Sequence, residues 1–236
     1  MEKISILAPT RQRPGFVNDL VESCVNHAQH PELIEFVFYI DSDDDTYGDL
    51  SVLASKFNCD IKQVSGERIV LSQMWNECYK VCTGDILMHC GDDLRFRSEN
   101  WDTVVRDKFN EFPDKIAFVF GNDGIWTPGE FGTHGFIHRN WAETVGYFVP
   151  PYFSSDYNDT WLNDVARGVG RWFYVDIYTE HLHPTVGKSA WDQNHQDRLK
   201  RHASDNVAMI YKAKLKERMS DVAKLQNYIK NFGVEQ

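Results

Sequence analysis

The stretch Gly84-Asp85-Ile86-Leu87-Met88-His89-Cys90-Gly91-Asp92-Asp93 runs from an apolar strand directly into an acidic pair. A second apolar run, residues 36–40, ends in the same way at Asp41. Continuous apolar runs of this length are typical of parallel strands that are buried on both faces. In open α/β sheets, ligands bind beyond the carboxyl ends of such strands. We therefore expect Asp41, Asp92 and Asp93 to share one edge of a sheet and to face a ligand.

Strands and helices alternate through the first half of the chain, which predicts an α/β sheet. The expected strands are 4–8, 36–40, 59–64, 85–89 and 116–120, and the expected helices are 16–28, 50–57, 71–82 and 101–112. The second half is less regular, and we expect a helix at 159–167, a strand at 173–183, and loops with short elements around 137–141 and 150–151. An apolar period near 3.6 from 205 to 232 predicts one long amphipathic C-terminal helix.

Length and composition restrict the class of protein. The 236 residues are enough to bury a core without disulfides or metals, and five cysteines without a C-x-x-C pair argue against a disulfide framework or a zinc ribbon. The net charge of -10 disfavours a general nucleic-acid binder. The first residues enter a strand without a signal pattern, and no window is as apolar as a membrane span. We expect a cytoplasmic protein, in the host cytoplasm if it comes from a phage, with no membrane partner.

Three motifs in order, residues 4–11, 39–43 and 84–93, resemble the GT-A glycosyltransferases. The likeness is greatest to the large inverting family 2 and its small phage and bacterial relatives, and it covers roughly residues 3–187. The resemblance implies a Rossmann-like, mixed and mainly parallel sheet flanked by helices. It also implies a nucleotide-sugar half at about 1–120 and an acceptor half at about 121–196. We expect residues 197–236 to form a helical tail that packs on the same domain.

The resemblance also implies a donor site. In the family, the Pro-Thr-Arg loop and the Asp that closes the second strand hold the base and ribose of the nucleotide, and two further residues flank the nucleotide. The corresponding positions here are Pro9, Thr10, Arg11, Asp41, Arg68 and Asn76. The Asp-x-Asp metal motif of the family corresponds to Gly91-Asp92-Asp93, with glycine at the first acidic position. This leaves Asp93 as the main metal carboxylate and Asp92 as a nucleotide or sugar contact, and carboxylates suit Mn²⁺ or Mg²⁺.

A His-x-His pair ends the last predicted strand. Alternation places His181 and His183 on one face of that strand. Many GT-A enzymes complete the metal shell with a histidine from this region, so we expect His183 to be a ligand and His181 to be its neighbour or a phosphate contact. The same pair would also suit a metal-dependent hydrolase, which is the rival class of enzyme.

An inverting transferase needs a base that deprotonates the attacking hydroxyl. In the family, this base precedes a helix and follows an aromatic, glycine-rich acceptor loop, here residues 146–153. Asp159 matches the position of the base best, and Asp156 is the second candidate. An aspartate that opens a helix is also a common N-cap.

The function implied is metal-dependent transfer of a hexose or pentose from a nucleotide sugar, expected to be UDP-linked, to an acceptor hydroxyl with inversion. A nucleotide-sugar or sugar-binding module without turnover stays open as an alternative. A nucleotidyltransferase is disfavoured because the first loop lacks a glycine-rich phosphate cradle. Arg95 and Arg97 are candidates to face the diphosphate or the acceptor. The aromatic candidates for stacking on a sugar or base are Trp126, Trp141, Tyr152 and Trp161.

The phage relatives include enzymes that glycosylate hydroxylated bases in DNA. Residues 197–236 carry 9 Lys and Arg against 5 Asp and Glu. Seven of these basic residues could meet a phosphate backbone, namely Arg198, Lys200, Arg201, Lys212, Lys214, Lys216 and Arg218. The alternative is a solvated face of an amphipathic helix. Modified DNA is therefore one candidate acceptor.

Overall fold

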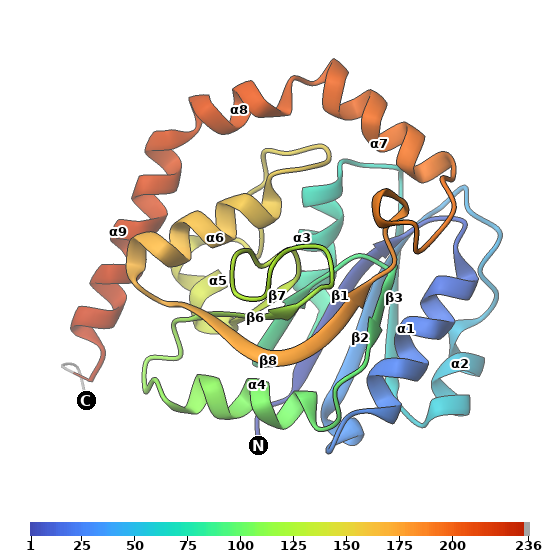
Figure 1. Ribbon diagram of the computed structural model, residues 1–236, viewed down its shortest axis with the longest axis horizontal. Helices are drawn as coiled ribbons and strands as arrows, with labels where there is room; N and C mark the ends of the chain where they lie inside the picture. Colours follow the sequence, from blue (N-terminus) through green and yellow to red (C-terminus); the bar gives the residue numbers. More distant parts are fainter. Residues whose placement is uncertain (234–236) are drawn as a thin grey trace.

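The computed structural model describes residues 1–233, and residues 234–236 at the end of the predicted tail lie outside the described residues. Its centre is one eight-stranded sheet of order β3-β2-β1-β4-β7-β6-β8-β5 (Figure 1). The strands are β1 (Ile4–Thr10), β2 (Ile34–Asp41), β3 (Asp60–Gly66), β4 (Ile86–His89), β5 (Leu94–Phe96), β6 (Phe118–Asn122), β7 (Gly135–His138) and β8 (Trp172–His181). The pairings β1/β2, β1/β4, β2/β3 and β6/β8 are parallel, and β4/β7, β6/β7 and β5/β8 are antiparallel. The predicted mixed, mainly parallel sheet is confirmed.

Helices cover both faces of the sheet because alternate side chains of its buried strands point to opposite sides. In β1, Ile6 and Ala8 enter one core and Leu7 enters the other. The first core is closed by α1 (Pro14–Asn26), α2 (Leu50–Phe57) and α4 (Trp101–Asn110). The second core is closed by α3 (Leu71–Val81), α5 (Arg139–Val145), α6 (Asn158–Val169) and α9 (Leu215–Asn231). The result is a three-layer arrangement.

The C-terminal region forms an arc of three helices over one end of the molecule (Figure 1). It consists of α7 (Gln193–Ser204), α8 (Val207–Ala213) and α9. The expected long C-terminal helix is confirmed over the range of α9, but it does not reach back to residue 205. Asn206 takes a left-handed conformation (φ 51°) and Lys214 departs from helical geometry (φ -88°, ψ 21°), so the chain turns at both positions. The apolar residues keep the helical period across the turn at Lys214, so the sequence pattern of this region resembles that of one helix.

Four further elements were not assigned from the sequence. They are the short strand β5, strand β7 and helix α5 in the region around 137–141 where loops with short elements were expected, and helix α7. Two short 3-10 helices, Pro31–Leu33 and Pro184–Val186, complete the secondary structure of residues 1–233. Within that range, no helix is both long and apolar enough to cross a lipid bilayer.

Candidate active site

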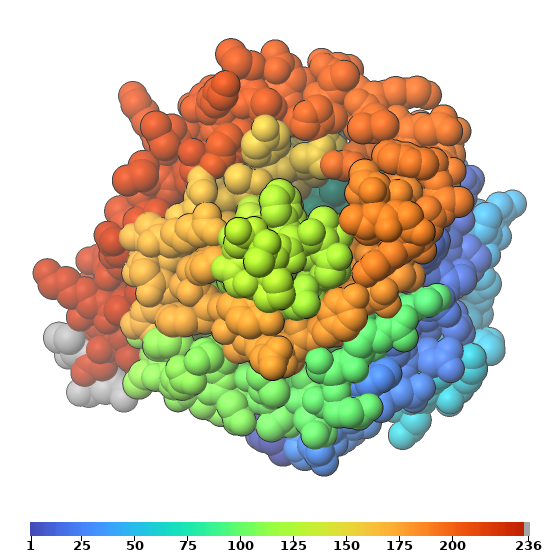
Figure 2. Space-filling model, in the orientation of Figure 1, coloured from blue at the N-terminus to red at the C-terminus, as the bar shows by residue number. Residues whose placement is uncertain are grey.

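A pocket of about 300 Å³ lies beyond the carboxyl ends of β1, β2 and β4. Its mouth is visible in Figure 2 as a hollow between the green loop before β7, the gold loop before α6 and the orange segment after β8. Eleven of the predicted residues line it: Pro9, Thr10, Arg11, Asp41, Arg68, Asp92, Asp93, Asp156, Asp159, His181 and His183. The expected meeting of strand-end carboxylates is therefore present in the fold.

Among the residues predicted to hold the nucleotide or the metal or to act as the base, Asn76 is the one that does not line the pocket. Its side-chain oxygen accepts the N–H of Phe148 at 2.9 Å, and its amide nitrogen donates to the carbonyl of Val149 at 2.9 Å. These bonds tie α3 to the loop after α5. Asn76 positions that loop, and nothing in this geometry supports a nucleotide contact.

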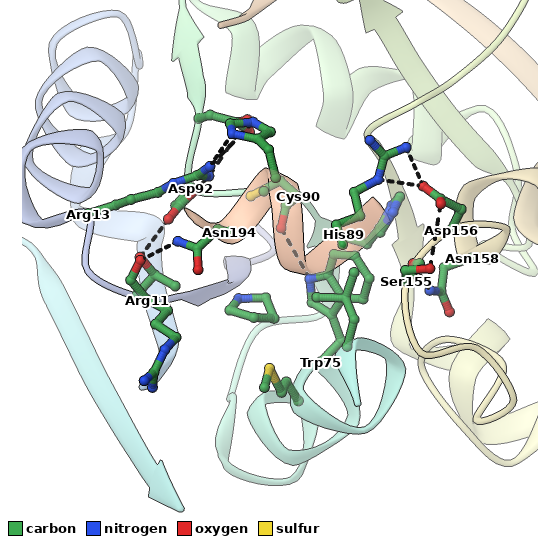
Figure 3. A pocket seen from close by; sticks show the side chains of 18 of the residues that line it. Arg11, Arg13, Trp75, His89, Cys90, Asp92, Ser155, Asp156, Asn158 and Asn194 are labelled. Atoms are coloured by element: carbon green, nitrogen blue, oxygen red, sulfur yellow. Dashed lines mark hydrogen bonds and ion pairs between the residues drawn. The ribbon is translucent and has the colours of Figure 1, made fainter. Parts of the chain in front are cut away.

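Asp92 is buried and already bonded on both oxygens. The hydroxyl of Thr10 donates to it at 2.6 Å, and Nη1 of Arg13 donates at 2.9 Å (Figure 3). Burial raises the pKa of Asp92 to about 6, because the loss of solvation outweighs the attraction of Arg13.

Asp93 lies beside a histidine from the other half of the chain. The Nε2 atom of His181 is 3.4 Å from Oδ2 of Asp93, and Nη1 of Arg13 is 4.0 Å from the same oxygen. Burial alone would raise the pKa of Asp93, but the contact with His181 and the neighbouring cation hold it below its usual range. A Cβ atom on Gly91 would lie 2.6 Å from Oδ1 of Asp93. Glycine at this position therefore makes room for the Asp93 carboxylate.

Five histidines form a row along the pocket, and the sequence indicated only two of them. Successive ring centroids are 6.1, 4.7, 5.2 and 5.4 Å apart along the row His89, His134, His181, His183 and His195. Burial lowers the pKa of His89 to about 4 and holds the pKa of His134 well below its ordinary value, so both rings are neutral near pH 7. Both ring nitrogens of His134 and Nδ1 of His89 are buried without a hydrogen-bond partner. Such atoms are rare in proteins, and a bound water, ion or ligand is one way of satisfying them.

The side chains around Asp93 offer few metal ligands. Within residues 1–233, no group of three or more His, Cys, Asp or Glu side chains converges in a way that could hold an ion. The carboxylate of Asp93 and the imidazole of His181 are nevertheless adjacent, and the ring centroids of His181 and His183 are 5.2 Å apart. Oxygen and imidazole donors suit Mn²⁺, and such cations often take their remaining ligands from substrate phosphates and water. An ion at this place would therefore take Asp93 and His181 as protein ligands and the rest of its ligands from the donor substrate and water.

The opposite end of the pocket carries an unsatisfied acceptor. Nη1 of Arg11 donates to Oδ2 of Asp41 at 2.8 Å, and Nε of Arg68 lies 3.8 Å from the same oxygen. The other oxygen of Asp41, Oδ1, is buried without a partner. Burial raises the pKa of Asp41. A ligand hydroxyl at this position would supply the missing donor.

Two carboxylates on the far wall differ in their surroundings. Asp156 pairs with Nη2 of Arg198 at 2.6 Å and with Nδ1 of His202 at 2.5 Å. Oδ1 of Asp159 accepts the N–H of Thr160 at 2.7 Å, whereas its Oδ2 makes no hydrogen bond or ion pair within residues 1–233. Burial raises the pKa of Asp159 to about 6. Figure 3 shows Asp156 and Asp92 on opposite sides of the pocket, with Trp75 and His89 between them.

Helix α7 lies across the pocket and is tied to its rim. Asp192 caps the helix by accepting the N–H of His195 at 3.0 Å, and it pairs with Nε of Arg13 at 2.6 Å. Arg68 pairs with Asp197 on the helix at 2.7 Å. The same helix brings Arg198 and Arg201 into the pocket lining, and Nε of Arg201 is buried without a hydrogen-bond partner. The sequence indicated these two arginines only as DNA contacts.

The remaining candidates lie away from the pocket. Arg95 pairs with Asp19, and Arg97 pairs with Glu180 at 2.7 Å. Trp141 and Trp161 are core residues, and Tyr152 packs on Trp161. Of the four aromatic candidates, Trp126 is the exposed one, with half of its surface open to solvent.

Comparison with known proteins identifies the architecture. No protein-family model and no curated protein matches the sequence. Among solved structures, TarS of S. aureus superposes with a TM-score of 0.58 at 13% identity, over 86% of this chain and 44% of TarS. The fold is that of the GT-A glycosyltransferases. At this level of identity, the likeness establishes the fold alone.

Two other GT-A structures give the same result with bound ligands. TarS 1–349 in complex with UDP matches 99% of this chain and 92% of its own length, with a TM-score of 0.58 and 13% identity. The mannosyltransferase PcManGT of Pyrobaculum calidifontis, in complex with GDP-Man and Mn²⁺, matches 88% of this chain with a TM-score of 0.57 and 12% identity. The chain spans less than half of the longer TarS structure and about two thirds (64%) of the mannosyltransferase.

Proposed function

We propose that the chain is a metal-dependent, inverting glycosyltransferase that moves a sugar from a nucleoside-diphosphate sugar, UDP-linked, to an acceptor hydroxyl. One observation supports the proposal: the Asp93–His181 pair lines the same pocket as Asp159, whose Oδ2 atom has no partner within residues 1–233. The ligands named for the solved GT-A structures, UDP, UDP-GlcNAc and GDP-Man, support a nucleotide sugar as donor.

The nucleotide would occupy the end of the pocket near β1 and β2. The unpartnered Oδ1 of Asp41 suits a ribose hydroxyl, and Pro9, Thr10, Arg11 and Arg68 surround it. We assign this donor half to residues about 1–120, the acceptor half to about 121–196 and the tail to 197–236, of which Arg198 and Arg201 line the pocket. We propose that Asp92 contacts the sugar or the nucleotide. His181, rather than His183, is the histidine that lies beside Asp93.

The reaction breaks the bond between the anomeric carbon and the β-phosphate oxygen, and the electron pair leaves with the diphosphate. The acceptor oxygen forms the new bond from the opposite face, and its proton passes to Oδ2 of Asp159. A positioned base of this kind contributes about 10²–10⁴-fold to the rate. Arg13 and Arg201 line the same pocket and would offset the negative charge of the leaving group. Asp93 with His181 or His183 would hold a Mn²⁺ or Mg²⁺ ion, which would supply Lewis-acid stabilisation of the same charge.

Asp156 is the weaker candidate for the base. Arg198 and His202 occupy its two oxygens, so an acceptor hydroxyl would have to displace a cation. Its contacts suit a residue that positions Arg198 on the pocket wall.

Modified DNA is a candidate acceptor because of the phage relatives. Several of the basic residues expected to face a DNA backbone are paired internally, including Arg198 with Asp156, Lys214 with Glu217 and Arg218 with Asp164. A DNA acceptor therefore predicts transfer that falls steeply with salt through the remaining cations.

The experiment is a screen of UDP- and GDP-sugars for release of nucleoside diphosphate with Mn²⁺, first without and then with acceptors. A transferase releases diphosphate slowly alone and faster with an acceptor, and the product carries the sugar with inverted configuration. A hydrolase that uses the His181/His183 pair releases free sugar at a rate that no acceptor changes. A binding module shows a thermal shift with the donor and no release.

A further inference from the structure

An open groove adjoins the donor pocket on the other side of its acidic wall. It is lined by Trp126, Phe131, Tyr157, Leu199 and His202, and it shares Asp156, Asp159 and Arg198 with the donor pocket. We propose that this groove binds the acceptor as a neutral sugar ring stacked on Trp126. The inference rests on the proposed function, and it names the substrate class of the acceptor side.

The side chain of Trp126 provides an exposed aromatic platform on which a sugar ring can stack. Its indole is half exposed, and the ring of Phe131 supports it at a centroid distance of 5.2 Å. The C–H face of a sugar ring is apolar and carries partial positive charge, which complements the negative face of an indole. An exposed tryptophan beside a catalytic pocket is therefore suited to a carbohydrate.

The loop that carries Trp126 is held in place before any ligand arrives. Oδ1 of Asp123 accepts the N–H groups of Ile125 and Trp126 at 2.9 and 3.1 Å, and Oδ2 accepts the hydroxyl of Thr133 at 2.6 Å. The side chain of Asn163 on α6 bonds both the N–H and the carbonyl of Gly132. In Figure 2 this green loop lies directly beside the mouth of the pocket. A fixed platform loses little conformational freedom on binding.

The groove leads to the base. Because Asp159 lines both cavities, a ring stacked on Trp126 can direct a hydroxyl toward Oδ2 of Asp159 while the donor occupies the other side. Tyr157 and Thr160 provide further hydroxyl groups along the same wall.

The charges of the groove favour a neutral ligand. Its two basic side chains, Arg198 and His202, both pair with Asp156. Asp159 and the exposed Glu130 of the platform loop add negative charge. A phosphate backbone would meet no free cation among these lining residues, whereas a polyhydroxylated ring can donate to the carboxylates. The groove therefore suits a glycoside better than DNA.

The test compares the wild-type chain with Trp126→Ala and Trp126→Phe. Methyl glycosides are the probe, and a DNA duplex with 5-hydroxymethylcytosine is the second arm. We expect a glycoside to accelerate diphosphate release, Trp126→Ala to lower kcat/KM for that glycoside at least tenfold with the acceptor-free release unchanged, and Trp126→Phe to restore part of it. Met209→Ala, at a residue equally exposed on α8 and outside the groove, is the control and should match wild type.

Saturation-transfer NMR measures glycoside binding in the presence of UDP. This measurement tests the inference separately from the proposed function. Binding that Trp126→Ala abolishes supports the groove even if no donor is turned over. Donor turnover that only the DNA duplex accelerates, or glycoside effects that Trp126→Ala leaves unchanged, would overturn the inference and leave the proposed function intact.

Discussion

The Nε2 atom of His181 lies 3.4 Å from the Oδ2 atom of Asp93, although the two residues come from different halves of the chain. Asp93 follows β4 near the centre of the sheet, and His181 ends β8 near its edge. The backbone N–H of Leu182 donates to the carbonyl of Asp93 at 2.8 Å and holds the two segments together. This contact joins the predicted donor half of the chain to the predicted acceptor half.

Replacing His181 with phenylalanine should raise the Mn²⁺ concentration needed for half-maximal turnover at least ~10-fold, because one donor beside Asp93 is lost. Titration of donor hydrolysis with Mn²⁺ measures the effect. His30→Phe, at a histidine outside the pocket, should leave the titration unchanged. Equal Mn²⁺ dependence in the wild-type chain and His181→Phe would remove His181 from the metal site.

The variant Asp159→Asn should lose transfer by about 10²–10⁴-fold while it binds the donor normally, since an amide cannot accept the proton of the acceptor. Asp156→Asn should have a smaller effect, because it changes the position of Arg198 and not the base. Transfer rates and donor dissociation constants for both variants make the comparison. If Asp156→Asn were the more severe variant, the two roles would be exchanged.

The transfer rate should depend on pH with an apparent pKa near 6. The proposed base acts only as a carboxylate, and burial raises the pKa of Asp159 to about 6. Transfer should therefore rise with pH through this value, level off above it, and fall tenfold per pH unit below it. Since the pKa of Asp92 is also raised to about 6, the profile is measured in Asp92→Asn as well. A profile that loses its acidic limb in that variant would assign the titration to Asp92.

His134→Phe should stabilise the fold and weaken activity. Both ring nitrogens of His134 are buried without partners, and an unsatisfied buried polar group costs about 1–3 kcal/mol. A phenylalanine of similar shape removes that cost, so Tm should rise, whereas a donor that bonds to His134 should bind more weakly. Calorimetry and the donor KM test the two effects. A lower Tm with unchanged KM would show that His134 is only a packing residue.

The strand-end carboxylates could be predicted because they depend on local pattern and on a general property of parallel sheets. Residues 86–88 are apolar and end in His89, as in a buried strand, so the position of Asp92 and Asp93 follows once the sheet is parallel. The boundaries of α2 were predicted as 50–57 and are the same in the structure, since Asp49 caps the helix and its apolar spacing is regular.

The contacts of Arg13 and His134 could not be predicted, because they are made between segments far apart in the chain. Arg13 meets Asp92 across two neighbouring strand ends and meets Asp192 only because α7 crosses the pocket. A helix as polar as α7 has no apolar stripe to reveal it. His134 lies in a loop without periodicity. His89 did carry a signal, since a histidine that ends a buried strand two residues before Gly91 points to an unusual environment.

Mn²⁺-dependent release of nucleoside diphosphate by the wild-type chain and by Asp93→Ala tests the central claim most directly. Asp45→Asn, at an exposed carboxylate outside the pocket, is the matched control. We predict that at least one UDP- or GDP-sugar is cleaved by the wild-type chain and by the control, that EDTA stops the reaction, and that Asp93→Ala is folded and inactive. Cleavage by Asp93→Ala at the wild-type rate, or no binding and no cleavage of any nucleotide sugar by the wild-type chain, would contradict this prediction.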